Sequence, residues 1–144
     1  MDINTSEIFL RLILAVFLGG LIGLERQIAH KTAGLRTFSL ISLGSALLTI
    51  VSYLLGKQYG ENFNVAILPA QIISGIGFIG AGIIIFHGIH PKGITTAAGL
   101  IVSAAVGMAV GFGFYSIAIF TTLLTLLIFT IMWFFEVKFI SKIK

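Results

Sequence analysis

The ionisable residues of this 144-residue chain that could do chemistry are few and far apart. The chain contains no cysteine, and its five acidic residues lie near the ends of long apolar runs. His87 and His90 are close enough in sequence to bind one metal ion, but no cysteine or carboxylate nearby would complete the site. We therefore interpret this segment as a solvated loop. Since no set of nucleophile, histidine and carboxylate converges either, we expect no catalytic site, no metal site and no enzyme.

Arg11 lies within the first apolar run, four residues after Glu7. Ionisable groups in lipid are costly, so each needs a partner. One interpretation is a guanidinium that reaches the membrane interface and pairs with Glu7, one helical turn away. The other is a contact with an anion or partner inside the bundle, because Arg11 is in line with Ala15, Gly19 and Gly23. The sequence leaves both interpretations open.

Two pairs of polar residues lie on either side of the loop between the first and second apolar runs. Glu25 and Arg26 end the first apolar run, and Arg36 and Thr37 begin the second. Consecutive membrane helices are antiparallel, so these ends meet at one surface across a short loop that contains Gly34. We expect Glu25 to pair with Arg36, as either a structural clamp or a regulatory or ion-sensing site.

Gln71 is a carboxamide inside the third apolar run, one helical turn before Ser74. Amide and hydroxyl side chains commonly hydrogen-bond between membrane helices. We expect Gln71 to bond across to Thr95 or Thr96 of the next helix.

The overall composition shows what surrounds these groups. Hydrophobic residues make up 58% of the chain and charged residues 10%, whereas about 25% of the residues in a soluble domain are charged. The chain must be surrounded by lipid, which excludes a secreted disulfide scaffold, a nucleic-acid-binding module and a conventional cytosolic enzyme. A membrane-spanning helix needs about 20 apolar residues. We therefore predict an all-α integral membrane protein, with one transmembrane domain over residues 1–144 and five spans at about 8–24, 38–55, 65–86, 93–110 and 114–135.

The lysine and arginine residues predict the orientation of these spans. Lys57 is the one cation expected on the side of the N-terminus. Seven lie on the other side, namely Arg26, Lys31, Arg36, Lys92, Lys138, Lys142 and Lys144. By the positive-inside rule, the N-terminus is outside and the C-terminus cytoplasmic. We expect the first span to be retained, because acidic residues precede it and no cleavage motif follows.

Small residues at helical spacing predict which spans pack closely. The residues expected to pack helices are Gly19, Gly23, Gly75, Gly82, Gly99, Ser103 and Gly107. We expect spans one, three and four to form a tight inner cluster, with the leucine- and phenylalanine-rich fifth span at the outside. Ordinary packing is one interpretation of the glycines; a path or a moving interface is the other. Gly75, Gly77 and Gly80 match a dinucleotide fingerprint, but no strand precedes them, so no nucleotide site is expected.

Two groups of segments resemble the signatures of a known family. GGLIGLER (19–26), AGLRT (33–37) and LGSALLT (43–49) resemble the first signature of the MgtC/SapB family of bacterial inner-membrane proteins. AQIISGIGFIGAG (70–82) and KGITTAAG (92–99) resemble the second. The resemblance implies a multi-pass protein of the cell inner membrane that is linked to growth under magnesium limitation and, in intracellular pathogens, to survival inside phagocytes. It also implies regulation in some members, with inhibition of the F-type ATP synthase attributed to one branch.

The resemblance also selects candidate functional residues. They are Glu25, Arg26, Gly34, Arg36, Thr37, Gln71, Ser74, Gly77, Gly80, Thr95 and Thr96. This chain departs from the family at Phe38, where histidine is frequent, and at Ile67 and Lys92, where arginine is frequent. Larger members continue into a cytosolic C-terminal domain, and functions that need that domain are not expected from these residues.

Two functions fit these observations. The first is a regulator that associates helix to helix with another membrane protein, such as a transporter or the ATP synthase. The alternative is an oligomeric transporter or channel for Mg²⁺ or another ion, lined by Gln71, Ser74 and backbone carbonyls. Hard cations favour carboxylate ligands, and every acid lies near a predicted span end, which favours the regulator. We expect contact with the lipid bilayer, a homo-oligomer and no nucleic acid. No cofactor is expected, although Mg²⁺ is a candidate ion.

Overall fold

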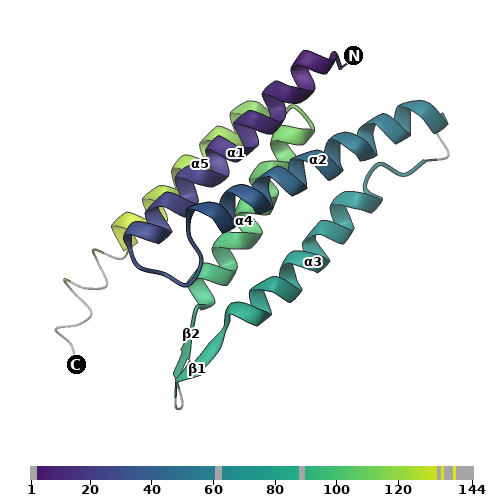
Figure 1. Cartoon of the computed structure of the whole chain (residues 1–144). Coiled ribbons are helices and arrows are strands. Elements are labelled where there is room, and N and C mark those ends of the chain that lie inside the picture. Colours follow the sequence, from purple (N-terminus) through teal and green to yellow (C-terminus); the bar gives the residue numbers. More distant parts are fainter. Residues whose placement is uncertain (1–2, 61–62, 88–89, 133, 135–137, 139–144) are drawn as a thin grey trace.

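The computed structural model describes residues 3–60, 63–87, 90–132, 134 and 138, and within these ranges the chain forms five α-helices (Figure 1). They are α1 (Thr5–Ile28), α2 (Leu35–Tyr59), α3 (Ile67–Ile83), α4 (Ile94–Gly111) and α5 (Tyr115–Leu127), which continues as a π-helical segment at Ile128–Met132. The predicted helical fold and helix count are confirmed. The predicted end of the fifth span at residue 135 lies outside the described residues.

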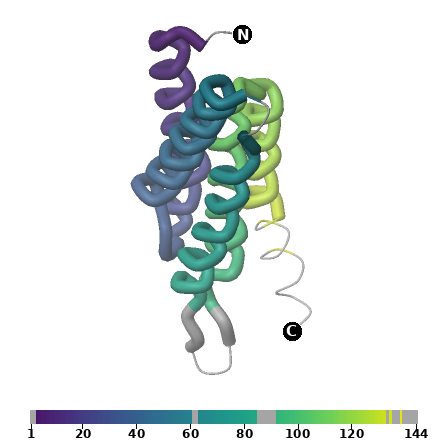
Figure 2. Tube along the Cα trace, turned by 90° about the vertical axis from the view of Figure 1, so that its right-hand side faces the viewer, coloured from purple at the N-terminus to yellow at the C-terminus, as the bar shows by residue number. Residues whose placement is uncertain are grey.

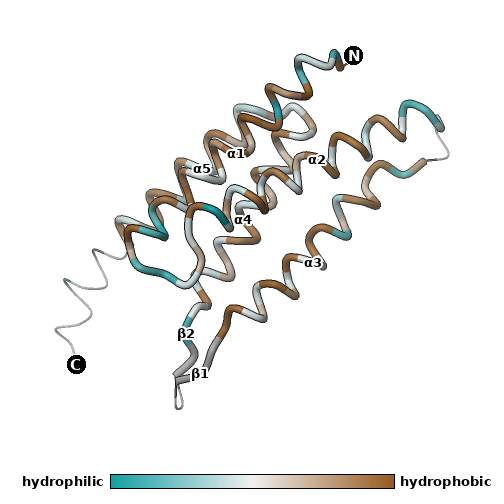
Figure 3. The backbone as a smooth tube through the Cα atoms, viewed as in Figure 1, coloured by the Kyte–Doolittle hydropathy of each residue, from teal (hydrophilic) through white to brown (hydrophobic). Residues whose placement is uncertain are grey.

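The lengths and compositions of these helices are those of membrane-spanning segments. Four stretches are long and apolar enough to cross a bilayer, namely Thr5–Ile28, Leu35–Tyr59, Ile94–Gly111 and Tyr115–Met132. The 17 residues of α3 are also apolar, and about 17 is the lower limit for a span. Figure 3 shows apolar residues along the helices, with hydrophilic ones mainly near their ends. The first turn of α1 and the last turn of α5 lie at opposite ends (Figure 1), as five crossings require. The predicted outside location of the N-terminus stays a prediction.

Close contacts between α1, α2 and α4 form the core of the bundle. A Cβ added at Gly19 would lie 2.7 Å from the Phe38 carbonyl oxygen, and one added at Gly107 would lie 2.2 Å from that of Ser42. Glycine therefore lets the backbones of α1 and α4 approach that of α2 from two sides. The turn between α4 and α5 is also made by glycine, because Gly113 has φ +86°, a value that other residues rarely adopt.

The third helix lies outside this core, which corrects the predicted inner cluster of spans one, three and four. It packs chiefly on α4 and less on α2. It lies at one edge of the bundle in Figure 1 and in front of the other helices in Figure 2. Its buried residues are Ile72, Ile76 and Gly80 alone. The helices of the core bury more residues than α3 does, and α3 has a single narrow packing face. The second helix takes the place in the core that we predicted for the third.

A short antiparallel hairpin joins α3 to α4, where the sequence suggested helix as far as residue 86 and then a loop. Strand β1 (Ile85–His87) pairs with β2 (His90–Lys92), with His87 opposite His90. The run of isoleucines after Gly82 favours extended backbone over helix. Gly93, with φ +91°, then starts α4. The side chains of both histidines lie outside the described part of the structure.

Candidate functional site

Parts of the two sequence motifs, residues 19–26 and 33–37 of the first and 92–99 of the second, meet at the end of the bundle where α1 ends and α2 and α4 begin. A Cβ added at Gly99 of α4 would lie 3.3 Å from the Phe38 ring and 2.9 Å from the tip of Phe129. Phe38 is fully buried. Gly99 therefore leaves room for two aromatic rings, one from α2 and one from the π-helical segment after α5.

Arg26 completes this cluster from α1. Its guanidinium carbon lies 3.7 Å from the centre of the Phe129 ring, and only 3% of the residue is exposed. Its Nε donates a hydrogen bond to the carboxylate of Glu25. The carboxylate and the π face of the ring both favour the buried cation, so the contact offsets its desolvation. We call Glu25, Arg26, Phe38, Gly99 and Phe129 the arginine cluster.

The predicted ion pair between Glu25 and Arg36 is wrong. Glu25 pairs with Arg26, and Arg36 is exposed in the first turn of α2. A buried guanidinium gains most from a carboxylate, whereas an exposed one is hydrated. The connection is held instead by Gln27, whose side-chain oxygen accepts a hydrogen bond of 3.2 Å from the backbone N–H of Leu35.

Gly34 helps to place α2 beside α1. Its backbone carbonyl would lie 2.8 Å from a Cβ at Gly23. This close approach needs glycine on α1. Gly34 therefore contributes to the geometry of the cluster without lying in it. Thr37 is half-buried and precedes the fully buried Phe38.

A second cation, Arg11, is satisfied at the opposite end of the bundle. It donates hydrogen bonds to Glu7 at 2.5 Å, to the Gly111 carbonyl at 2.6 Å and to the Tyr115 hydroxyl at 3.0 Å. Only 6% of the residue is exposed. Both sequence interpretations are combined here, because Arg11 pairs with Glu7 and also points into the bundle. The contact ties α1 to the turn between α4 and α5.

The candidate residues of α3 do not join either cluster. Gln71, Ser74 and Gly77 are exposed, and Gly80 lies against Ala97 of α4. The predicted bond from Gln71 to Thr95 or Thr96 is wrong. The two helices are antiparallel, so nine residues of rise, about 14 Å, separate Gln71 from the level of Gly80 and the start of α4. Thr96 is buried and Thr95 exposed.

The residues proposed as packing positions divide into two groups. Gly19, Gly23, Gly99 and Gly107 all meet atoms of other helices, and Ser103 donates a hydrogen bond of 3.0 Å to the Phe38 carbonyl. At Gly75 and Gly82 an added Cβ would meet no atom within 4 Å. Among the residues that the structure describes, no other helix therefore packs against those two positions.

Sequence reasoning missed Phe129 and Tyr115. Tyr115 had a usable signal, since it is a polar aromatic residue at the start of α5, at the same end of the bundle as Arg11. Phe129 had none, because it is one of several aromatic residues in an apolar run. As for metal ions, no group of three or more histidine, cysteine, aspartate or glutamate residues is clustered in the part of the chain that the structure describes.

Comparison with known proteins gives relatives over most of the chain. The putative magnesium transporter YhiD of Escherichia coli K12 is 43% identical over 133 residues, covering 86% of this chain and 60% of that protein. Protein SapB of Bacillus subtilis is 44% identical over 127 residues, covering 85% and 54%. Protein MgtC of Brucella abortus is 46% identical over 108 residues, covering 75% and 44%. The chain thus spans about half the length of these relatives. No solved structure matches it.

A family model described as the MgtC family matches residues 12–137. This match includes the arginine cluster, α3 and the hairpin. The resemblance seen in the motifs is thereby confirmed, and this chain belongs to the MgtC family.

Proposed function

We propose that this protein is a regulator of the cell inner membrane, linked to adaptation to magnesium limitation, which acts by helix-to-helix association with another membrane protein. The partner that we propose is a transporter or the ATP synthase. The observation that carries the proposal is the surface of α3. This helix packs on one side only and leaves most of its small residues exposed.

Four small residues form a continuous line along the exposed surface of α3. They are Ala70, Ser74, Gly77 and Ala81, and all four are exposed. We call this line the α3 outer stripe. Its spacing of four, three and four residues keeps it on one helical face. Small residues at such spacing let a neighbouring helix approach closely in lipid, which supports docking of a partner helix here.

The test is crosslinking in living cells grown at low magnesium. A photo-crosslinking amino acid in place of Ser74 should give one discrete adduct, and mass spectrometry should identify another membrane protein in it. A Gly77→Leu change should abolish the adduct. It should leave the fold intact, because a Cβ at Gly77 would meet no atom within 4 Å. The control is the same crosslinker in place of Ile13, which is 68% exposed on α1. Identical adducts from both positions, or adducts with lipid alone, would refute docking at the stripe.

An ion pathway is the second candidate, because a relative bears the name putative magnesium transporter. The exposed Gln71 and Ser74 oxygens of several copies could line such a path. Mg²⁺ flux into liposomes containing the purified chain decides between the two. Ser116, an exposed residue of α5, provides the control. Flux that is lost in Gln71→Ala and kept in Ser116→Ala would favour the transporter over the regulator.

A further inference from the structure

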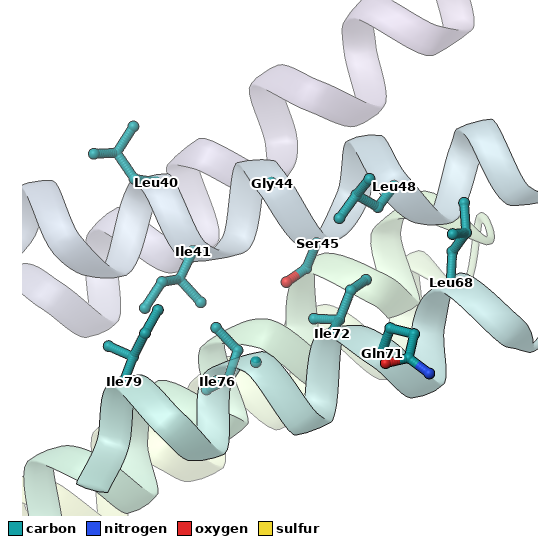
Figure 4. Close-up of a pocket in the computed structure, with 11 residues that line it drawn as sticks. Leu40, Ile41, Gly44, Ser45, Leu48, Leu68, Gln71, Ile72, Ile76 and Ile79 are labelled. Carbon is teal, nitrogen blue, oxygen red and sulfur yellow. The ribbon is translucent and has the colours of Figure 1, made fainter. Parts of the chain in front are cut away.

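An apolar groove lies between α2 and α3, on the flank of α3 away from the outer stripe (Figure 4). Its volume is about 350 Å³, and leucine and isoleucine side chains from both helices line most of it. Each wall also contributes one glycine, Gly44 from α2 and Gly75 from α3. A Cβ at either position would meet no atom within 4 Å. The two glycines thus widen the groove without being required by packing inside the chain.

One hydroxyl points into this groove without a partner. Ser45 is 3% exposed, and in Figure 4 its oxygen is directed from α2 toward α3. Three other buried hydroxyls, those of Thr49, Ser52 and Ser103, each donate to a backbone carbonyl. In the described part of the chain, the Ser45 hydroxyl makes no such bond. A lipid tail in the groove would leave this hydroxyl unpaired in hydrocarbon, at a cost in free energy.

One face of α3, which includes two residues of the groove and extends beyond it, is complementary in shape to an identical face. Gln71, Gly75, Phe78 and Gly82 are spaced by four, three and four residues, so they share one helical face. Phe78 is 83% exposed, and the glycines on either side of it are open. One face therefore carries a protruding ring and two recesses. Gln71 adds a carboxamide, which can donate to and accept from an identical group.

We propose that two copies of this chain associate through this face of α3, each α3 lying along the mouth of the other's α2–α3 groove. Copies in one membrane have the same orientation, so a twofold axis along the membrane normal brings the two α3 helices together in parallel. Phe78 of each copy then lies over the Gly75 or Gly82 recess of the other. The two Gln71 carboxamides pair with each other near the end of the groove. The outer stripe stays free, so this interface is separate from the docking proposed above.

Cysteine crosslinking in membranes tests the interface directly, because the chain contains no cysteine of its own. Single Gln71→Cys and Phe78→Cys variants should form disulfide-linked dimers on mild oxidation, since a disulfide needs Cα atoms within about 7 Å. The matched control is Ile73→Cys, which is 44% exposed on the same helix but outside the shared face. Dimers from Ile73→Cys in equal yield, or none from either test position, would overturn the proposal.

A second measurement uses the mass of the purified protein in detergent. The unmodified chain should be a dimer, and Gly75→Leu should shift the dimer dissociation constant by on the order of tenfold or more, because the recess is filled. Gly77→Leu, on the outer stripe, should leave it unchanged. Both positions are open within the chain, so both variants should fold. A monomer with lipid retained in the groove, or a Gly75→Leu variant as dimeric as the unmodified chain, would overturn the proposal.

Discussion

Glycine has opposite surroundings at the α2–α4 crossing and on α3. A Cβ added at Gly107 would lie 2.2 Å from the Ser42 carbonyl oxygen, whereas one added at Gly77 would meet no atom within 4 Å. Both residues belong to regular small-residue patterns in apolar helices. The difference shows that such a pattern marks a helix surface suited to close approach, without showing whether the approaching helix belongs to the same chain.

The polar groups differ between these regions in the same way. Near the core, Arg26 has Glu25 and the Phe129 ring, and Ser103 has the Phe38 carbonyl. On α3, Gln71 and Ser74 are exposed. The core is therefore nearly complete within one chain, and α3 is the region where association with other chains would satisfy what the fold leaves open.

The largest effect is expected from Gly107→Ala. The added methyl group would overlap a backbone carbonyl that cannot move without shifting α2, so the free energy of unfolding should fall by about 3 kcal/mol. Denaturant unfolding in detergent, followed by circular dichroism, measures it. An unchanged unfolding midpoint would contradict the close contact of α2 and α4.

Next in size is Arg26→Ala. This change removes the stacked cation and leaves Glu25 without its partner, so the free energy of unfolding should fall by about 2 kcal/mol. The matched control is Arg36→Ala in exposed surroundings, which should change it by less than about 0.5 kcal/mol. Equal losses from the two variants would mean that the arginine cluster contributes no more than a surface charge.

Two buried serines where α2 and α4 cross allow a hydrogen-bonded hydroxyl to be compared with one that has no partner. Ser103→Ala removes the bond to the Phe38 carbonyl and should cost about 1 kcal/mol. Ser42→Ala removes a buried hydroxyl oxygen that makes no hydrogen bond, so it should leave stability unchanged or slightly raised. The same unfolding experiment ranks the pair, and a greater loss from Ser42→Ala would reverse the assignment.

The smallest effect on stability is expected from Gly77→Ala. The new methyl group enters open space, so the free energy of unfolding should change by less than about 0.5 kcal/mol. A loss comparable with that of Gly107→Ala would remove the contrast between α3 and the crossing.

Parts of the site could be predicted from the sequence because they depend on neighbours along one helix. The pair of Arg11 with Glu7 is such a case, since four residues make one helical turn. The aromatic partner of Arg26 could not be predicted in this way. Phe129 is more than 100 residues away and has no distinctive sequence context, so its position over the guanidinium depends on how α5 packs. The exposed state of Gln71 likewise follows from the placement of α3.

The sequence by itself determined that this chain is a membrane protein, that it forms five apolar helices with turns at glycine, and that it carries the two MgtC-family motifs. Those features follow from hydropathy, from helix length and from local backbone preference. Only the tertiary structure decided that α2 and not α3 completes the core, that Glu25 pairs with Arg26, and which glycines are covered. The physical reason is that one small-residue pattern suits any neighbouring helix, and the neighbour is selected by the packing of the whole bundle.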